Sequence, residues 1–150
     1  MAGTRDLTIE EATSVDDDLV AAFGALVPQL SRRAAPPVAA ELEAMLRTPA
    51  TTLLVARDAT GRVVGSLTLA VFRIPTGLRA WIEDVVVDGA ARGSGIGAAL
   101  VTAALERAEA AGARTVDLTS RPDREAANRL YVRLGFEARS TNVYRYSSPD

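Results

Sequence analysis

The feature that most constrains the fold is a strand-like run that leads through a glycine-rich loop into a helix. Residues 80–87 are largely apolar on both sides of the strand alternation, which is typical of a central strand covered on both faces. Residues 92–98 contain three alternating glycines, and residues 95–111 are strong helix formers that stop at Gly112. This order places free backbone N–H groups and the positive end of a helix dipole at one point, so we expect a phosphate to bind there.

The rest of the chain predicts an α/β (α+β) domain in which antiparallel strands dominate. Two strand-like runs, residues 51–57 and 63–72, flank a turn with Gly61, which is a hairpin signal. Further strands are expected at residues 7–12, 114–119, 136–138 and 142–146. Helices are expected from a capping box of Ser14 and Asp17 to Pro28, from Pro36 to Thr48, over residues 95–111, and from Pro122 to Gly135.

These elements predict one mixed, mostly antiparallel central sheet of about six to seven strands, flanked by about four helices. With 150 residues, of which 48% are hydrophobic, the chain can bury one good core and is too short for two ordinary domains. We therefore expect a single domain over residues 1–150.

Residue types that are missing exclude several kinds of site. The chain has no cysteine and no histidine, and all 17 of its basic residues are arginine. Thiolate nucleophiles, Ser-His-Asp triads and metal sites built from histidine or cysteine are therefore excluded, and no metal is expected.

Charge and hydropathy bear on partners and location. The formal net charge of -2 comes from well-mixed charges without a basic stripe, which argues against nucleic acid as a partner. Residues 1–6 lack the apolar core of a signal peptide, and no apolar run approaches the roughly 18 residues of a membrane span. We expect a cytoplasmic protein that does not bind membranes.

Three phosphate-binding motifs and a ligand-free turn compete for the glycine loop. A Walker A loop needs lysine where the chain has Ala98. The dinucleotide fingerprint fits by letter, with Gly93, Gly95 and Ala98 in place and Asp117 about 20 residues on. Against that fingerprint, residues 88–92 separate the strand from the glycines, Asp117 is central in its expected strand, and the preceding elements form a meander.

The third motif is carried by Arg92, Gly95 and Gly97, in the pattern Arg-x-x-Gly-x-Gly. This pattern resembles the acyl-CoA loop of the GNAT superfamily of N-acetyltransferases. Residues 82–100 as a whole look like the central strand, pyrophosphate loop and following helix of that family.

A second segment extends the resemblance downstream. Asn128 and Tyr131, with residues 134–136, look like the second CoA-contacting segment of the family, so the specific match covers about the last seventy residues. The sequence departs from the family at Gly89, where proline is common.

The resemblance implies direct transfer of an acetyl group from acetyl-CoA to a primary amine of a small molecule or peptide. Glu83 is the candidate general base, Tyr131 the candidate acid for the leaving thiolate, and Asp84 a substrate contact. Asn128 and the backbone of Val85, Val86 and Val87 would hold the pantetheine arm. The pyrophosphate would contact Arg92, Gly93, Ser94, Gly95, Ile96, Gly97 and Ala98.

The two catalytic candidates also have structural interpretations. A regular strand puts Glu83 on the face of Trp81, Val85 and Val87, where apolar neighbours would make it a stronger base, and Asp84 on the opposite face. A bulge, which the resemblance implies in this strand, could re-aim either carboxylate. The alternatives are that Glu83 is an ion-paired structural carboxylate and that Tyr131 is a core residue.

Other functions stay open at this point. The same fold could serve as a catalytically idle acyl-CoA sensor or interaction module, and the dinucleotide fingerprint leaves an NAD-binding enzyme as a third option. A homodimer is compatible with so small a chain.

Overall fold

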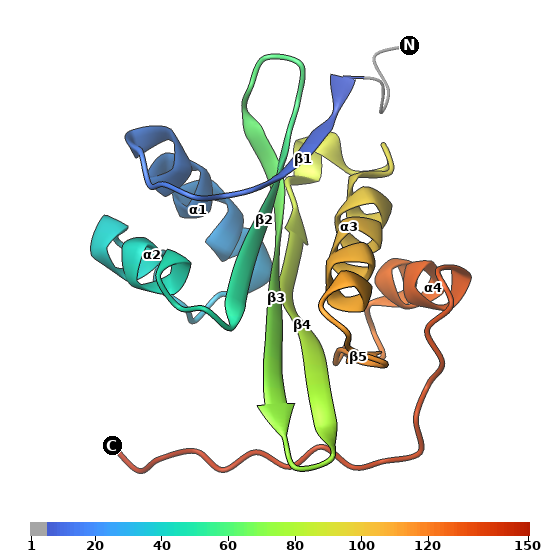
Figure 1. Cartoon of the computed structure of the whole chain (residues 1–150). Helices are drawn as coiled ribbons and strands as arrows, with labels where there is room; N and C mark the ends of the chain where they lie inside the picture. Colours follow the sequence, from blue (N-terminus) through green and yellow to red (C-terminus); the bar gives the residue numbers. More distant parts are fainter. Residues whose placement is uncertain (1–5) are drawn as a thin grey trace. The chain divides into compact units, whose positions relative to one another are not determined.

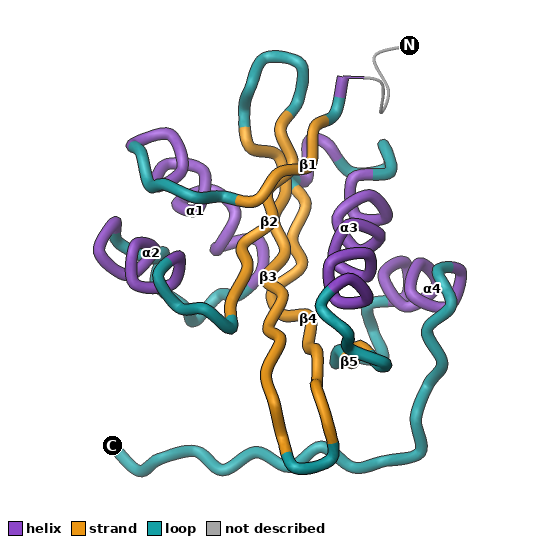
Figure 2. Tube along the Cα trace, viewed as in Figure 1, coloured by secondary structure: helices purple, strands orange, loops and turns teal. Residues whose placement is uncertain are grey.

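The structure is a computed structural model that describes residues 6–150. The chain divides into two compact units, Met1–Thr119 and Ser120–Asp150. The first unit contains a sheet with three α-helices, and the second contains α4, Glu125–Arg133. Figure 1 follows the elements in chain order, and Figure 2 separates helices, strands and loops.

The sheet of the first unit is mixed and mostly antiparallel, as predicted. Its strands lie in the order β1-β2-β3-β4-β5, with three antiparallel pairings and a parallel one between β4 and β5. The predicted hairpin around Gly61 is confirmed by the pairing of β2 with β3. The strand bounds are Thr8–Glu11 for β1, Thr51–Arg57 for β2, Val63–Ile74 for β3, Gly77–Val87 for β4 and Val116–Asp117 for β5.

Helices cover both faces of this sheet (Figure 1). On one face α1, Asp17–Leu30, and α2, Ala39–Leu46, pack into a core cluster that includes Leu53 and Val86. On the other face lies α3, Ile96–Ala110, which follows β4 through the short 3-10 helix η2, Gly89–Ala91. No helix among residues 6–150 combines the length and apolar character needed to cross a membrane.

The start of α1 differs from the predicted capping box. The N-cap is Asp16, whose Oδ1 accepts a hydrogen bond from the Leu19 N–H at 2.8 Å, so the predicted Ser14 cap is wrong by two residues. Asp and Ser cap helices about equally well, so the residue types alone do not distinguish the two positions. The helix also continues two residues beyond Pro28, because a proline in the last turn removes few helical hydrogen bonds.

The two predicted C-terminal strands, residues 136–138 and 142–146, are wrong. No strand follows β5 in the described part of the chain, and the predicted strand at 114–119 shortens to β5. Three apolar side chains of the tail are exposed instead, with exposed fractions of 74% for Val143, 88% for Tyr144 and 87% for Tyr146. An alternating pattern forms a strand only where an edge accepts its hydrogen bonds and a core its side chains. The described sheet therefore has five strands.

The close approach of α3 to the sheet can be tested with two glycines. A Cβ on Gly65 in β3 would lie 3.0 Å from Ile96 Cγ2 and 3.2 Å from Leu100 Cδ1, whereas a Cβ on Gly24 in α1 would meet nothing within 4 Å. We expect Gly65→Ala to lower the free energy of unfolding by about 1–3 kcal/mol, and the control Gly24→Ala to raise it by about 0.5–1 kcal/mol. Urea denaturation measures both. Equal stabilities would show that α3 does not pack this closely.

Candidate functional site

A β-bulge interrupts β4 just before the glycine loop. Thr68 of β3 pairs with Glu83, but Ser66, two residues away, pairs with Val86, so β4 carries one extra residue. Asp84 within the bulge has a φ of 51°, the only positive φ of a non-glycine residue among residues 6–150. The bulge that the resemblance implies is therefore present, and it lies at the candidate acids.

The bulge changes which residues share a face with Glu83. Thr68, the partner of Glu83, and Ser66, the partner of Val86, are two residues apart and therefore lie on one face of β3. Glu83 and Val86 accordingly share a face of β4. Val86 belongs to the core cluster under α1 and α2, and Glu83 therefore faces that side. The prediction that Val87 lies on this face is wrong, because Val87 pairs with Gly65, which faces α3.

The two acidic side chains of the bulge are accessible. Glu83 and Asp84 are both exposed, which corrects the prediction that apolar neighbours enclose Glu83. None of the ion pairs within residues 6–150 involves Glu83, so the structural ion-pair interpretation lacks a partner there. In the same residues, no three His, Cys, Asp or Glu side chains are grouped as a metal site.

The edge of β4 that faces away from β3 is open over the C-terminal half of the strand. β5 pairs only with Ala80 and Trp81, so no strand of the described chain covers this edge from Ile82 to Val87. An uncovered edge offers backbone N–H and C=O groups to an extended ligand in the way a further strand would. The predicted contacts at Val85, Val86 and Val87 lie on this open stretch.

The glycine loop turns the chain from β4 into α3. Gly93 and Gly95 have φ values of 85° and 80°, a region that favours glycine, and Gly95 is the N-cap of α3. The first helical hydrogen bond runs from the Ala99 N–H to the Gly95 carbonyl at 3.0 Å. The N–H groups of the three residues between them, Ile96, Gly97 and Ala98, therefore have no acceptor within the helix.

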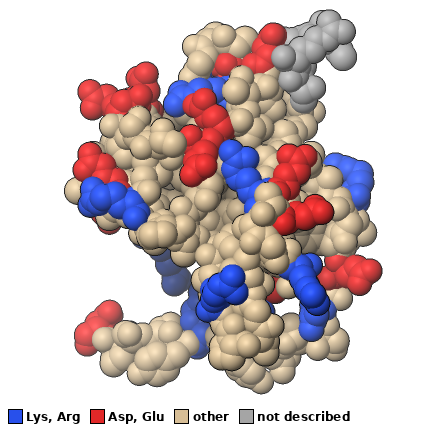
Figure 3. Space-filling view, in the orientation of Figure 1, with Lys and Arg blue, Asp and Glu red and all other residues tan. Residues whose placement is uncertain are grey.

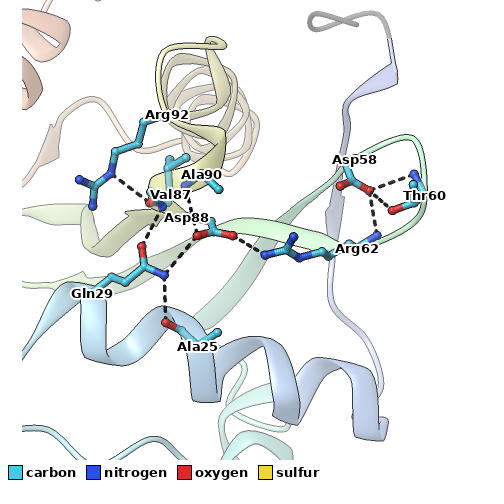
Figure 4. Close-up of polar contacts among 10 residues, drawn as sticks. Ala25, Gln29, Asp58, Thr60, Arg62, Val87, Asp88, Ala90 and Arg92 are labelled. Atoms are coloured by element: carbon cyan, nitrogen blue, oxygen red, sulfur yellow. Dashed lines mark hydrogen bonds and ion pairs between the residues drawn. The ribbon is translucent and has the colours of Figure 1, made fainter.

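Arg92 provides a basic side chain at the start of this loop. Arg92 is exposed, and its Nε donates a hydrogen bond to the Val87 carbonyl at 3.4 Å (Figure 4). Ser94 is also exposed, and its hydroxyl donates to the Ala91 carbonyl, which closes the turn before α3. Free amides, a helix N-terminus and an arginine fit a pyrophosphate group.

Figure 3 shows basic and acidic side chains interspersed on the visible face of the protein.

The other two predicted residues, Asn128 and Tyr131, lie on α4 in the second unit. They are one helical turn apart, and the Asn128 Nδ2 donates to the Arg121 carbonyl at 3.0 Å. Tyr131 is 8% exposed and contacts Phe136 edge to face, with ring centroids 5.8 Å apart. Burial raises the pKa of the Tyr131 phenol above its ordinary value of 10.0, against the opposing effect of the Arg124 charge. The phenol therefore holds its proton at neutral pH.

Sequence reasoning missed one contact that lies beside the site. The side chain of Gln29 on α1 bonds to Asp88 and Gly89, which lie between β4 and the loop (Figure 4). Nothing in the sequence signals this contact, because Gln29 and Asp88 are 59 residues apart.

The backbone of the bulge gives a stability test at Asp84. Asn tolerates a positive φ at least as well as Asp, whereas a β-branched side chain does not. We expect Asp84→Val to lower the free energy of unfolding by about 1–3 kcal/mol and Asp84→Asn to change it by less than about 0.5 kcal/mol. Urea denaturation of the two variants measures the difference. A valine variant as stable as the asparagine variant would contradict the left-handed backbone at this position.

With this geometry in place, comparison with known proteins identifies the family. A family model for the Acetyltransferase (GNAT) family matches residues 14–136, across both units. An L-methionine sulfoximine/L-methionine sulfone acetyltransferase of Pseudomonas aeruginosa is 37% identical over 86 residues, which are 57% of this chain and 50% of that protein. The chain thus spans about half the length of this curated relative.

Solved structures agree in fold. A Trypanosoma brucei acetyltransferase has a TM-score of 0.77 and 28% identity, with 95% of this chain and 100% of that chain covered. An aminoglycoside acetyltransferase from a soil metagenomic sample, in complex with sisomicin, has a TM-score of 0.83 over 97% of each chain, and its 21% identity supports the fold alone. The chain belongs to the Acetyltransferase (GNAT) family.

Proposed function

We propose that this chain is an N-acetyltransferase that moves an acetyl group from acetyl-CoA to a primary amine of a small molecule or peptide. The observation that carries the proposal is a row of three N–H groups at the start of α3, those of Ile96, Gly97 and Ala98, which have no hydrogen-bond acceptor among residues 6–150. This row follows directly on the open edge of β4. A ligand that joins a pyrophosphate to an extended arm with amides fits both features.

The co-substrate would lie along the loop and the strand. The pyrophosphate takes the free amides of α3 and the guanidinium of Arg92, since both donate to phosphate oxygens. The pantetheine arm pairs with the backbone of Val85 to Val87, and Asn128 donates to one of its amides. In this proposal both units form one catalytic domain over residues 1–150, which the family match across residues 14–136 supports.

The reaction is a direct substitution at the thioester carbonyl. The amine nitrogen attacks the carbonyl carbon, and the oxyanion that forms is stabilised by backbone N–H groups at the bulge. The C–S bond then breaks and CoA leaves as a thiolate. Before the attack, the ammonium form of the amine loses one proton to Glu83 or to a water bound by it. After the attack, the nitrogen loses a second proton to solvent, and the thiolate takes one proton from Tyr131, whose phenol is reprotonated from solvent.

The proposed roles of Glu83 and Tyr131 follow from the cost of moving two protons, one from the amine and one to the thiolate. An alkylamine has a pKa of about 10, so leaving its deprotonation unassisted near pH 7 costs on the order of 4–5 kcal/mol. The exposed carboxylate of Glu83 can accept that proton. The raised pKa of Tyr131 keeps the phenol protonated for its donation to the thiolate.

The acceptor is proposed from charge and from the relatives. The carboxylates of Glu83 and Asp84 are exposed next to each other and suit a cationic amine. Relatives are named for acetylation of L-methionine sulfoximine and of aminoglycosides. We propose an amine of this general kind, small and cationic.

The proposal is tested by CoA release from acetyl-CoA over a panel of amines. The panel contains L-methionine sulfoximine, an aminoglycoside and a peptide with a free N-terminus. Amine-dependent thiol release together with acetylated product supports the proposal. Binding of acetyl-CoA without release over the whole panel would favour an acyl-CoA sensor, and stabilisation by NAD alone would favour the dinucleotide interpretation.

The role of Tyr131 is tested with an amine of the panel that the protein acetylates. Tyr131→Phe is expected to lower kcat by roughly a hundredfold or more and to leave the Kd of acetyl-CoA within about twofold. General-acid activity is present while the phenol is protonated and is lost as the pH rises through its pKa. Since that pKa is raised above 10.0, we expect the alkaline fall in kcat above pH 10.0, and its absence in the variant.

Tyr144→Phe is the matched control, because Tyr144 is 88% exposed in the same unit. It should retain the kcat of the parent. Loss of acetyl-CoA binding in Tyr131→Phe with turnover preserved would contradict the assignment of the acid.

A further inference from the structure

One glutamine side chain joins α1 to the segment that precedes the glycine loop. The Oε1 of Gln29 accepts a hydrogen bond from the Gly89 N–H at 2.8 Å, and its Nε2 donates to Asp88 Oδ1 at 3.3 Å. The same Nε2 donates to the Ala25 carbonyl at 3.0 Å, which fixes the side chain against its own helix (Figure 4). Both the Oε1 and the Nε2 of Gln29 are therefore bonded to the segment of Asp88 and Gly89.

Asp88 extends this contact to a third element. Its Oδ2 pairs with Arg62 Nη2 at 2.5 Å, while its Oδ1 also accepts from the Ala90 N–H at 3.4 Å and caps η2. Arg62 lies in the turn between β2 and β3, where Asp58 Oδ1 accepts the N–H groups of Thr60 and Arg62 at 2.9 Å and 3.1 Å. The side chain of Asp88 is only 14% exposed although its partners lie at the surface. Three separate parts of the first unit thus converge on Asp88 and Gly89.

The location of this network gives it a consequence for the loop. Asp88 and Gly89 directly follow the last residue of β4, and the phosphate-binding loop begins three residues later at Arg92. A chain held at this point has fewer conformations available to the amides that follow it, so less conformational entropy is lost when a ligand orders them. The bond to Gln29 needs the N–H of residue 89, which a proline at this position could not donate.

We propose that Gln29 is a positioning residue for the pyrophosphate loop. Through the Gly89 N–H and the Asp88 carboxylate it holds the start of η2, and so raises the affinity for acetyl-CoA without taking part in the chemistry. This inference rests on the proposed function, in which the loop binds the pyrophosphate of acetyl-CoA. The helix that carries Gln29 also covers the face of the sheet on which Glu83 lies.

Two variants remove the Gln29–Gly89 bond from its opposite ends. Gln29→Met deletes the polar atoms of the side chain at similar volume, and Gly89→Pro deletes the backbone donor at the first position of η2, where proline is tolerated. Gly89→Ala is the matched control, because it keeps the N–H and its Cβ would lie at an ordinary 3.5 Å from Gln29 Oε1. Gln29 is exposed, so the fold should survive its replacement, which urea denaturation checks.

The readouts are the Kd of acetyl-CoA by titration calorimetry and kcat at saturating acetyl-CoA. We expect Gln29→Met and Gly89→Pro each to raise Kd roughly three- to tenfold, with kcat within about twofold of the parent. The Kd of the double variant should not exceed the higher of the two single-variant Kd values, because the two substitutions remove the same bond. Gly89→Ala should bind like the parent.

Three results would overturn the inference. Unchanged Kd values in both single variants would show that the bond does not position the loop. Additive losses in the double variant, or equal losses in Gly89→Ala and Gly89→Pro, would show that the two residues act separately or through bulk at position 89. A parent protein that does not bind acetyl-CoA would refute the proposed function itself, and this inference with it, so the two failures are distinguishable.

Discussion

The extra residue in β4 is the constraint on which the candidate site depends. It holds Asp84 in a left-handed backbone conformation, which costs of the order of 1–3 kcal/mol in a non-glycine residue. The long antiparallel pairing of β3 with β4 on both sides of the bulge keeps the backbone in this state. A bulge re-aims side chains and increases the local twist of its strand. Glu83 lies before the extra residue, in regular register with Thr68, on the face covered by α1 and α2. The extra residue brings Val86 to that same face and turns Val87 toward α3.

The same strand provides the two other parts of the site. Within the part of the chain that the structure describes, its edge is paired with β5 only at Ala80 and Trp81, so its last residues remain open to an extended ligand. Beyond Val87 the chain enters η2 and then α3, whose first three amides have no acceptor within the helix. Backbone amides at a helix start bind phosphate without a lysine side chain, so the absence of lysine from this chain does not exclude such a site.

Much of this arrangement could be predicted from local sequence patterns. The β2–β3 hairpin, the strand at β4, the glycine loop and α3 all follow from signals within a few residues. The N-cap at Asp16 was missed because Ser14 offers a similar side chain two residues earlier. The tail around Tyr144 was predicted as a strand because alternation in a sequence does not show whether a partner edge exists.

The remaining differences come from interactions that a linear pattern does not contain. A period of two residues assigned Val87 to the face of Glu83, and one inserted residue was enough to reverse it. The contact between Gln29 and Asp88 joins residues 59 positions apart, and neither residue type is unusual at its position. Exposure of Glu83 likewise depends on how far α1 and α2 extend over the sheet, which the helix lengths alone do not determine.

The central claim is that the first amides of α3 bind the pyrophosphate of acetyl-CoA, and a titration followed by backbone amide NMR tests it most directly. The account predicts that the N–H signals of Ile96, Gly97 and Ala98 shift most on addition of acetyl-CoA, and that NAD at the same concentration leaves them in place. Signals at these three residues that stay unmoved while acetyl-CoA binds elsewhere, or that respond equally to NAD, would contradict it.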